Sequence, residues 1–276
     1  MDTSSAQHQY VTGQMRESFG PLFADHEARN ARTVAEGGWQ LDQPYGEHAR
    51  ECRDLRPAAA PRGTVLYLHA GYWQSRDKSQ FRFLAPAFNA LGWAMALANY
   101  PRCREVGRAR IVESAALALR QLARHQGRQG RQGPLVLCGH SAGAHLAVEL
   151  ALRHAEGRLD GSPALAGVVA ISGVFDLRPL LGTTLNDKLR LDAAQAQACS
   201  PCLRPQPNAV PALFLVGQAE TAAFHAQSQD MARAWQSQGN DARCEVVAGT
   251  DHFSILAGIA QADGPVARRL QAWAAG

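Results

Sequence analysis

The sequence predicts an α/β protein in which a mostly parallel sheet carries helices on both faces. Short apolar runs alternate with helix-like segments along the chain, and glycine or proline separates them. The apolar runs lack the polar alternation of half-exposed strands, which is typical of strands buried on both faces of a parallel sheet. The chain has 276 residues, 46% hydrophobic and 19% charged, which suffices for a substantial core. We expect one domain over residues 1–276.

Eight segments are predicted to be strands of this sheet. Two extended stretches, 39–45 and 48–57, come first and are joined by a turn around Gly46. Apolar runs rich in aliphatic residues follow them at 64–69, 94–100, 135–138, 167–172, 212–216 and 244–248. The expected sheet is therefore eight-stranded, and most of its strands are expected to be parallel.

Helices are predicted between these strands. Residues 108–125 repeat apolar side chains at the helical period, at Ile111, Ala115, Leu119 and Leu122. Similar segments lie at 142–155, 224–238 and 264–274. The glycine-rich GRQGRQG at 127–133 has no apolar spacing, so we expect a loop there.

Residues 177–208 interrupt the alternation of strands and helices. The segment is too long for an ordinary connection between a strand and a helix. We therefore expect a small helical cap inserted over one end of the sheet, where a ligand-covering lid belongs.

The charge, the apolar runs and the cysteines of the sequence indicate which partners and which compartment to expect. The formal net charge is +4, and the basic residues are scattered, so we expect no nucleic-acid partner. The N-terminus MDTSSAQHQY lacks the features of a signal peptide, and no apolar run approaches the ~20 residues that span a bilayer, so we expect no membrane partner. Apart from Cys199 and Cys202, the six cysteines lie far apart in the sequence, and we expect reduced thiols in a cytoplasmic protein.

One pair of cysteines has motif spacing. Cys199-Ser-Pro-Cys202 is a CxxC motif, but it lacks the second pair that a structural zinc site needs. It also lies in a proline-rich segment rather than at a helix start, so we expect no redox function. The chain contains none of the P-loop, G-x-G-x-x-G or H-E-x-x-H motifs, and we expect neither a metal nor a cofactor.

The stretch GHSAGAH, residues 139–145, carries the strongest signal of chemistry. It follows the apolar run 135–138 directly and opens a predicted helix. G-x-S-x-G at a strand-to-helix junction is the nucleophile elbow of α/β-hydrolases, which predicts that fold and Ser141 as the nucleophile. The N–H of Ala142 would then point toward a developing oxyanion. The alternative is an ordinary tight turn in a chain that holds 25 glycines.

The elbow requires an acid and then a histidine downstream. His252 comes just after the last apolar run, so we expect it to be the base. The other late histidine, His225, lies inside a helical segment and is expected at the surface. Glu220 is the nearest carboxylate after the run 212–216 and is the expected acid. The alternatives for the acid are Asp176, Asp230 and Asp251.

A second oxyanion loop is expected after the strand at 64–68. His69-Ala-Gly-Tyr-Trp73 follows it, and Gly71 allows a backbone that aims its own N–H and that of Tyr72 into the site. Tyr72, Trp73 and Phe253 are expected to offer aromatic faces to a small-molecule substrate, with simple packing as the alternative. His140 is expected to pack beneath the elbow.

Several of these motifs resemble the arylformamidase (kynurenine formamidase) branch of the α/β-hydrolases. The most specific are H-A-G-Y-W at 69–73, G-H-S-A-G-A-H-L-A at 139–147 and D-H-F-S-I-L at 251–256. The resemblance extends to S-G-V-F-D-L-R-P-L at 172–180 and to the cap segment, in 183–192 and at Ser200-Pro201. It therefore covers most of the chain from about residue 40 to 260.

The resemblance implies hydrolysis of N-formyl-L-kynurenine to L-kynurenine and formate, without a metal. It implies roles for six residues: Ser141 as nucleophile, Glu220 as acid, His252 as base, and Gly71, Tyr72 and Ala142 as oxyanion donors. Two positions depart from the family pattern, because Ala70 replaces a glycine and a glutamate stands at 220 where aspartate is common.

Two other functions remain open from the sequence. One is a carboxylesterase or amidase of the same fold that acts on another small aryl ester or formamide. The other is a hydrolase-fold binding module, although such proteins typically lose the serine or histidine. The sequence also leaves open whether the protein is a homodimer, and whether the first 40 residues cover the site.

Overall fold

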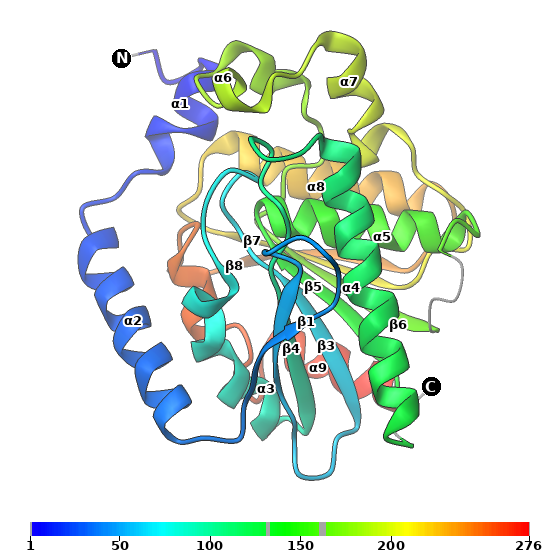
Figure 1. Ribbon diagram of the computed structural model, residues 1–276. Helices are drawn as coiled ribbons and strands as arrows, with labels where there is room; N and C mark the ends of the chain where they lie inside the picture. The colour runs from blue at the N-terminus through cyan, green and yellow to red at the C-terminus, as the bar shows by residue number, and fades with distance from the viewer. Residues whose placement is uncertain (1, 131–132, 160–163, 276) are drawn as a thin grey trace.

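One sheet organises the part of the chain that the computed structural model describes, residues 2–130, 133–159 and 164–275 (Figure 1). Its strand order is β1-β2-β4-β3-β5-β6-β7-β8. The strands are β1 (Gln40–Pro44), β2 (Cys52–Arg56), β3 (Gly63–Leu68), β4 (Trp93–Ala98), β5 (Leu135–His140), β6 (Leu165–Ile171), β7 (Ala212–Gly217) and β8 (Ala242–Val247). β2 pairs antiparallel with both β1 and β4, and the remaining pairs are parallel. The predicted eight-stranded, mostly parallel sheet of an α/β-hydrolase is confirmed.

The apolar runs become strands because both faces of the central sheet are covered. β3, β4, β5 and β7 are buried along their whole length. Alternate residues of each strand belong to different hydrophobic clusters, as Leu66 and Val65 do in β3. Apolar residues are therefore favoured on both faces of these strands, which explains the absence of polar alternation.

Helices cover both faces of the sheet. The α-helices are α1 (Ala6–Tyr10), α2 (Phe19–Ala35), α3 (Ala85–Ala90), α4 (Arg108–Arg128), α5 (Ala142–Ala155), α6 (Asn186–Leu189), α7 (Ala193–Ala198), α8 (Ala222–Gln236) and α9 (Pro265–Ala275). The 3₁₀ helices are η1 (Thr12–Gln14), η2 (Lys78–Leu84), η3 (Arg178–Gly182), η4 (Pro201–Leu203) and η5 (Ser254–Gly258). Apolar side chains of α4, α5 and α8 share one cluster, and those of η2, α3 and α9 share the other.

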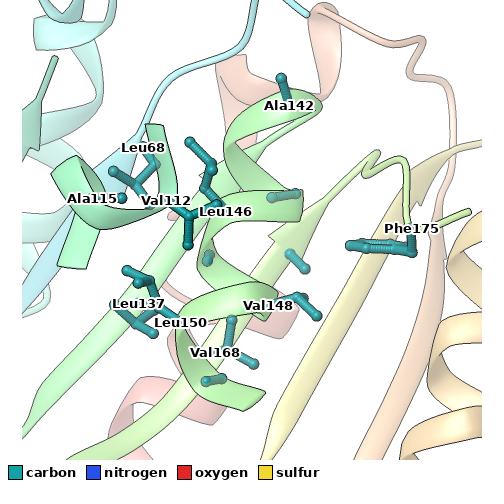
Figure 2. Packing of buried hydrophobic residues seen from close by; sticks show 14 of the residues in the cluster. Leu68, Val112, Ala115, Leu137, Ala142, Leu146, Val148, Leu150, Val168 and Phe175 are labelled. Atoms are coloured by element: carbon teal, nitrogen blue, oxygen red, sulfur yellow. The ribbon is translucent and has the colours of Figure 1, made fainter. Parts of the chain in front are cut away.

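Helix α5 is the most deeply buried of these helices. Leu146 and Leu150 lie on the same face of the helix and pack with Leu137 of β5, as Figure 2 shows. Ala142 stands at the N-terminal end of α5, one residue beyond the turn residue that follows the carboxyl end of β5. This packing fixes the position from which α5 presents its first N–H groups.

Strand register brings the loops of the site together. β3 and β5 are parallel neighbours, and Leu68 lies opposite Gly139 in their register. Because the strands end at the same edge of the sheet, the loop after Leu68 emerges beside the turn at Ser141. The two segments that the motifs singled out are therefore adjacent.

The N-terminal segment is more ordered than its polar composition indicated. It forms α1, η1 and α2, and α1 lies at the same end of the molecule as α6 and α7 (Figure 1). The side-chain amide of Gln7 donates to Thr184 Oγ1 at 3.1 Å, and the Thr184 N–H donates to Gln7 Oε1 at 2.9 Å. Residues 177–208 thus contact the start of the chain, while their role as a cap stays a prediction.

Two smaller observations complete the fold. The loop expected at 127–133 begins later than predicted, because α4 continues through Arg128, and residues 131–132 lie outside the described residues. Across the described ranges, the helices are all too short or too polar to cross a membrane.

Candidate active site

Ser141 occupies a sharp turn between β5 and α5. Its φ and ψ angles are 56° and −117°, a backbone conformation that a non-glycine residue rarely adopts. Its N–H donates to the Ile171 carbonyl at 2.8 Å, which anchors the turn to β6. A Cβ atom at Gly143 would come within 1.9 Å of the Leu68 carbonyl oxygen, so the turn requires glycine there. This strained strand-to-helix turn is the geometry of a nucleophile elbow.

A buried carboxylate orients the imidazole of His252. Nδ1–H of His252 donates to Glu220 Oε2 at 2.7 Å. The other carboxylate oxygen, Oε1, accepts from the Ser172 hydroxyl at 2.5 Å and from the Gly217 N–H at 2.8 Å. Because Nδ1 carries the proton, Nε2 is the nitrogen that is free to act as a base.

The other candidate acids are engaged elsewhere. Asp251 accepts hydrogen bonds from the backbone of Phe253 and Ser254, in the turn just before η5. Asp176 forms an ion pair with Arg178 at 2.7 Å, and Asp230 pairs with its neighbour Arg233 on the exposed face of α8. Of the four carboxylates considered, Glu220 is the one that binds the His252 imidazole.

His140 holds the backbone of His252. Its Nε2–H donates to the His252 carbonyl at 2.7 Å, and the two rings lie 4.7 Å apart. Complete burial, together with the nearby His252, lowers the pKa of His140 well below its ordinary value. His140 is therefore a neutral donor that ties the end of β5 to the loop of the expected base.

The loop after β3 has an unusual backbone. Gly71, Tyr72 and Trp73 have positive φ angles of 121°, 48° and 58°. A Cβ at Gly71 would lie 2.3 Å from the Ser75 carbonyl oxygen, which excludes larger residues. Within the described residues, the N–H groups of Gly71, Tyr72 and Ala142 have no acceptor. These are the three N–H groups expected to bind an oxyanion.

Two buried rings support this loop. His69 donates from Nδ1 to the Ala70 carbonyl at 2.7 Å, and the Tyr100 hydroxyl donates to the His69 carbonyl at 2.6 Å. The His69 and Tyr100 rings stack at 4.3 Å. Burial lowers the pKa of His69 to about 4, so it is neutral at physiological pH. Ala70, where the family has glycine, is buried and fits without disturbing these bonds.

The three aromatic residues predicted to bind substrate have different surroundings. Tyr72 is half-buried, and its hydroxyl donates to the Tyr10 carbonyl at 2.6 Å. Trp73 is almost fully buried, with its ring 5.0 Å from that of His145. Phe253 is half-buried, and its ring lies 5.0 Å from the His252 ring. Their contact with a substrate stays a prediction.

The structure adds one residue that the sequence-based prediction missed and one segment whose role that prediction left open. One is Ser172, which comes directly after β6 and donates to Glu220. The other is the N-terminal segment, because Gln14 donates to Thr221 Oγ1 at 2.9 Å and Arg16 donates to the Ala219 carbonyl at 2.7 Å, on either side of Glu220. The position of Ser172 at a strand end was the available signal, and the covering segment had none.

Neither the CxxC cysteines nor a group of metal ligands is found in this site among the described residues. Cys199 and Cys202 carry free thiols. In the parts of the chain that the structure describes, no three His, Cys, Asp or Glu side chains gather as metal ligands would. Acyl transfer by serine would use a hydroxyl on a strained turn, such as that of Ser141, together with an oriented imidazole, such as that of His252.

Comparison with known proteins agrees with this geometry. A family model described as the alpha/beta hydrolase fold matches residues 65–256. The chain belongs to the α/β-hydrolase family. The enzyme is 31% identical over 228 residues to a kynurenine formamidase of Danio rerio, covering 78% of this chain and 75% of the relative. It is 30% identical to a kynurenine formamidase of Salmo salar, covering 81% and 78%.

Solved structures resemble this hydrolase closely. A candidate thioesterase from Silicibacter sp. tm1040 superposes with a TM-score of 0.85 at 29% identity, covering 98% of this chain and 99% of that one. Esterase B from Lactobacillus rhamnosis has a TM-score of 0.68 at 18% identity and covers 93% of both chains, which shows the shared fold. The resemblance to the arylformamidase branch is thus confirmed at the level of sequence similarity.

Proposed function

We propose that this hydrolase removes the formyl group from an aryl formamide, with N-formyl-L-kynurenine as the substrate and L-kynurenine and formate as the products. The observation that carries the proposal is the similarity to kynurenine formamidases over three quarters of their length. The hydrogen bond between His252 and Glu220, at the edge of the sheet where Ser141 stands, supports it.

In the first step, Nε2 of His252 takes the proton of the Ser141 hydroxyl as Oγ attacks the formyl carbon. The negative charge that develops on the formyl oxygen is bound by the N–H groups of Gly71, Tyr72 and Ala142. His252 then gives its proton to the departing aryl nitrogen. L-Kynurenine leaves as the free amine, and the formyl group stays on Ser141 as an ester.

In the second step, water replaces the amine. His252 takes a proton from the water molecule as its oxygen attacks the formyl ester, and the same N–H groups bind the oxyanion. Collapse of this intermediate releases formate, and His252 returns the proton to Ser141. Glu220 stabilises the imidazolium in both steps and keeps its own charge throughout.

The burial of the site favours a small acyl group. Ser141 is 1% exposed, and Tyr10 of the N-terminal segment bonds to Tyr72 beside it. A formyl group carries only hydrogen on its carbonyl carbon and needs no acyl pocket. Longer acyl chains would have to displace packed side chains around the elbow.

Ester hydrolysis is the second candidate function. The observation that favours it is the close structural match to the candidate thioesterase, at 29% identity. The same nucleophile, base and oxyanion donors would serve for an ester or thioester, because the tetrahedral intermediate is alike. The distinction lies in the leaving group and acyl group that the site accepts.

The test compares two substrates on the same preparation. We would follow N-formyl-L-kynurenine deformylation by absorbance and p-nitrophenyl acetate hydrolysis by nitrophenolate release. Ser141→Ala should lower kcat/KM for both by at least about 10³-fold. Ser237→Ala, which changes an exposed serine at the end of α8, is the control and should leave both rates unchanged.

Deformylation at a much higher kcat/KM than ester hydrolysis would support the proposal. Ester turnover without deformylation would reject N-formyl-L-kynurenine as the substrate and favour the second candidate. Activity that survives in Ser141→Ala would reject the serine mechanism for either substrate.

A further inference from the structure

A cavity of about 440 Å³ lies between helix α2, η2 and the start of η5. Its lining includes the aromatic rings of three phenylalanines and four ionisable groups: Phe23, Phe81 and Phe253, and His26, Glu27, Arg76 and Arg82. The mechanism above uses none of these ionisable groups. In Figure 1, α2 is the long blue helix at the side of the sheet, and it packs against η2.

Arg76 is a cation without an anion. Its guanidinium carbon lies 4.5 Å from the centroid of the Phe23 ring and 5.4 Å from that of Phe253. Among the described residues it forms no ion pair and donates no hydrogen bond. Burial lowers the pKa of Arg76. By contrast Arg82, on the same cavity, donates to Asp54 at 2.7 Å.

The ring of Phe253 lies between the cavity and the expected base. Phe253 lines the cavity and follows the expected base, His252, with 5.0 Å between their rings. Arg76 follows the oxyanion loop, and its side chain lies close to Gly71. The guanidinium lies over the Phe253 ring, whose other neighbour is the His252 ring, and the aliphatic stem of Arg76 lies beside Gly71.

Two more polar groups face this space without partners. Nε2 of His26 is buried and unpartnered in the described part of the chain, and its ring stacks on Phe83 at 4.1 Å. Glu27, one residue further along α2, has no ion pair within the described ranges. An uncompensated cation, a free carboxylate and aromatic faces in one cavity match the charges of an α-amino acid beside an aryl ring.

We propose that this cavity binds the amino-acid end of the substrate, with Arg76 pairing to its carboxylate and Glu27 to its ammonium group. The inference rests on the proposed function and names the residues that would recognise the α-amino-acid group of its substrate. The aryl ring would then lie against Phe253, with the formamide directed toward Ser141. Formamides without a carboxylate would bind only through the aryl ring.

The test measures recognition of the carboxylate apart from chemistry. L-Kynurenine is used as an inhibitor of p-nitrophenyl acetate hydrolysis, and KM is compared for N-formyl-L-kynurenine and for formanilide, which has no amino-acid group. In Arg76→Met, the inhibition constant of L-kynurenine and the KM of N-formyl-L-kynurenine should each rise about 10- to 100-fold. The KM of formanilide should change less than about threefold.

Two further variants separate charge from packing. Arg76→Lys keeps the cation and should retain part of the affinity, because an ammonium pairs with a carboxylate through a single point charge. Arg29→Met is the matched control, since Arg29 also lies over a ring of this region, that of Phe83 at 4.9 Å, but is paired with Asp25. It should leave both affinities unchanged.

The outcomes distinguish this inference from the proposed function. If the wild type hydrolyses the ester but not N-formyl-L-kynurenine, the proposed function fails, while inhibition by L-kynurenine still tests the cavity. An inhibition constant equal in wild type and Arg76→Met would overturn the inference, as would absence of inhibition by L-kynurenine. An equal rise in KM for formanilide and N-formyl-L-kynurenine in Arg76→Met would show that Arg76 only packs against the phenylalanines.

Discussion

At the scale of single residues, the buried carboxylate of Glu220 is the group that depends most on its hydrogen-bond donors. Its two oxygens accept three hydrogen bonds, from Ser172, Gly217 and His252, and its side chain is fully buried. An ionised carboxylate without these donors would be costly at such a site. The donors also fix its orientation, and therefore the orientation of the imidazole.

Ser172→Ala removes one of these donors and should lower kcat about tenfold with little change in KM. The loss of a hydrogen bond to a charged acceptor costs about 1.5–3 kcal/mol, and the effect reaches the reaction through the orientation of His252. Steady-state kinetics on p-nitrophenyl acetate measure it. An unchanged kcat would mean that Gly217 alone suffices to hold Glu220.

Gly143→Ala should prevent stable folding of the elbow. A new Cβ would come within 1.9 Å of the Leu68 carbonyl oxygen, so β3 and α5 would have to separate. We expect a melting temperature at least about 8 °C lower, or no soluble protein. Gly20→Ala is the control, because a Cβ there meets nothing within 4 Å, and its melting temperature should stay the same or rise slightly. A folded Gly143→Ala with wild-type stability would contradict the described contact.

At the scale of elements, the N-terminal segment closes one side of the site. Tyr10 packs its ring 5.7 Å from Phe224 and accepts the hydrogen bond of Tyr72. The Gln9 carbonyl accepts from the Thr221 hydroxyl at 2.7 Å. α1 spans only Ala6–Tyr10, so these contacts, and not its own helix propensity, hold it in place.

Tyr72→Phe should loosen this segment without unfolding the core. The lost hydrogen bond, 2.6 Å long and partly buried, is worth about 1 kcal/mol of stability. The effect should be largest where the loop after β3 contacts α1. Hydrogen exchange of residues 6–14 should accelerate about fivefold, while β5 stays protected. Tyr67→Phe is the matched control, because that buried hydroxyl has no partner among the described residues, and exchange should not change. Equal exchange in both variants would show that the bond to Tyr10 is not what holds the segment.

Some elements of the fold could be predicted from the sequence and others could not. The central strands were predictable because burial on both faces demands unbroken apolar runs. Helix α2 was not predicted, because it is largely polar and is held by a few aromatic residues, such as Phe19, whose ring lies 4.9 Å from that of Phe253. Such contacts join positions far apart in the chain, which local patterns do not encode.

At the scale of the whole molecule, buried neutral histidines make the fold sensitive to acid. The pKa of His69 lies at about 4 in the folded protein, against 6.5 ordinarily. Below pH 6.5 the unfolded chain therefore binds a proton there that the folded chain does not, so stability falls as the pH drops toward 4. His69 alone is expected to lower the free energy of unfolding by about 3 kcal/mol between pH 6.5 and about 4.

Replacing His69 should remove that part of the pH dependence. In His69→Asn, the free energy of unfolding from urea titrations should fall less steeply between pH 6.5 and about 4.5 than in the wild type. The comparison concerns the slope, because the substitution also changes stability at neutral pH. Identical slopes in the two proteins would contradict a buried, neutral His69.

The candidate residues that directly follow strands could be predicted from the sequence. The contacts between segments that are distant in the sequence could not. Ser141, Glu220 and His252 could be named because each comes shortly after a strand of a parallel sheet, whose carboxyl ends share one edge. The covering of the site by the N-terminal segment and the exposure of Arg76 to a cavity arise from distant segments meeting in space. Neither leaves a local pattern in the sequence.

The central claim is that Ser141 is a nucleophile activated by His252. The most direct measurement is labelling with a fluorophosphonate, followed by mass spectrometry of the peptides. We predict one phosphonate per chain, on Ser141, with labelling at least about 100-fold slower in His252→Gln and absent in Ser141→Ala. A wild-type protein that stays unlabelled, or carries the label on another residue, would contradict the account.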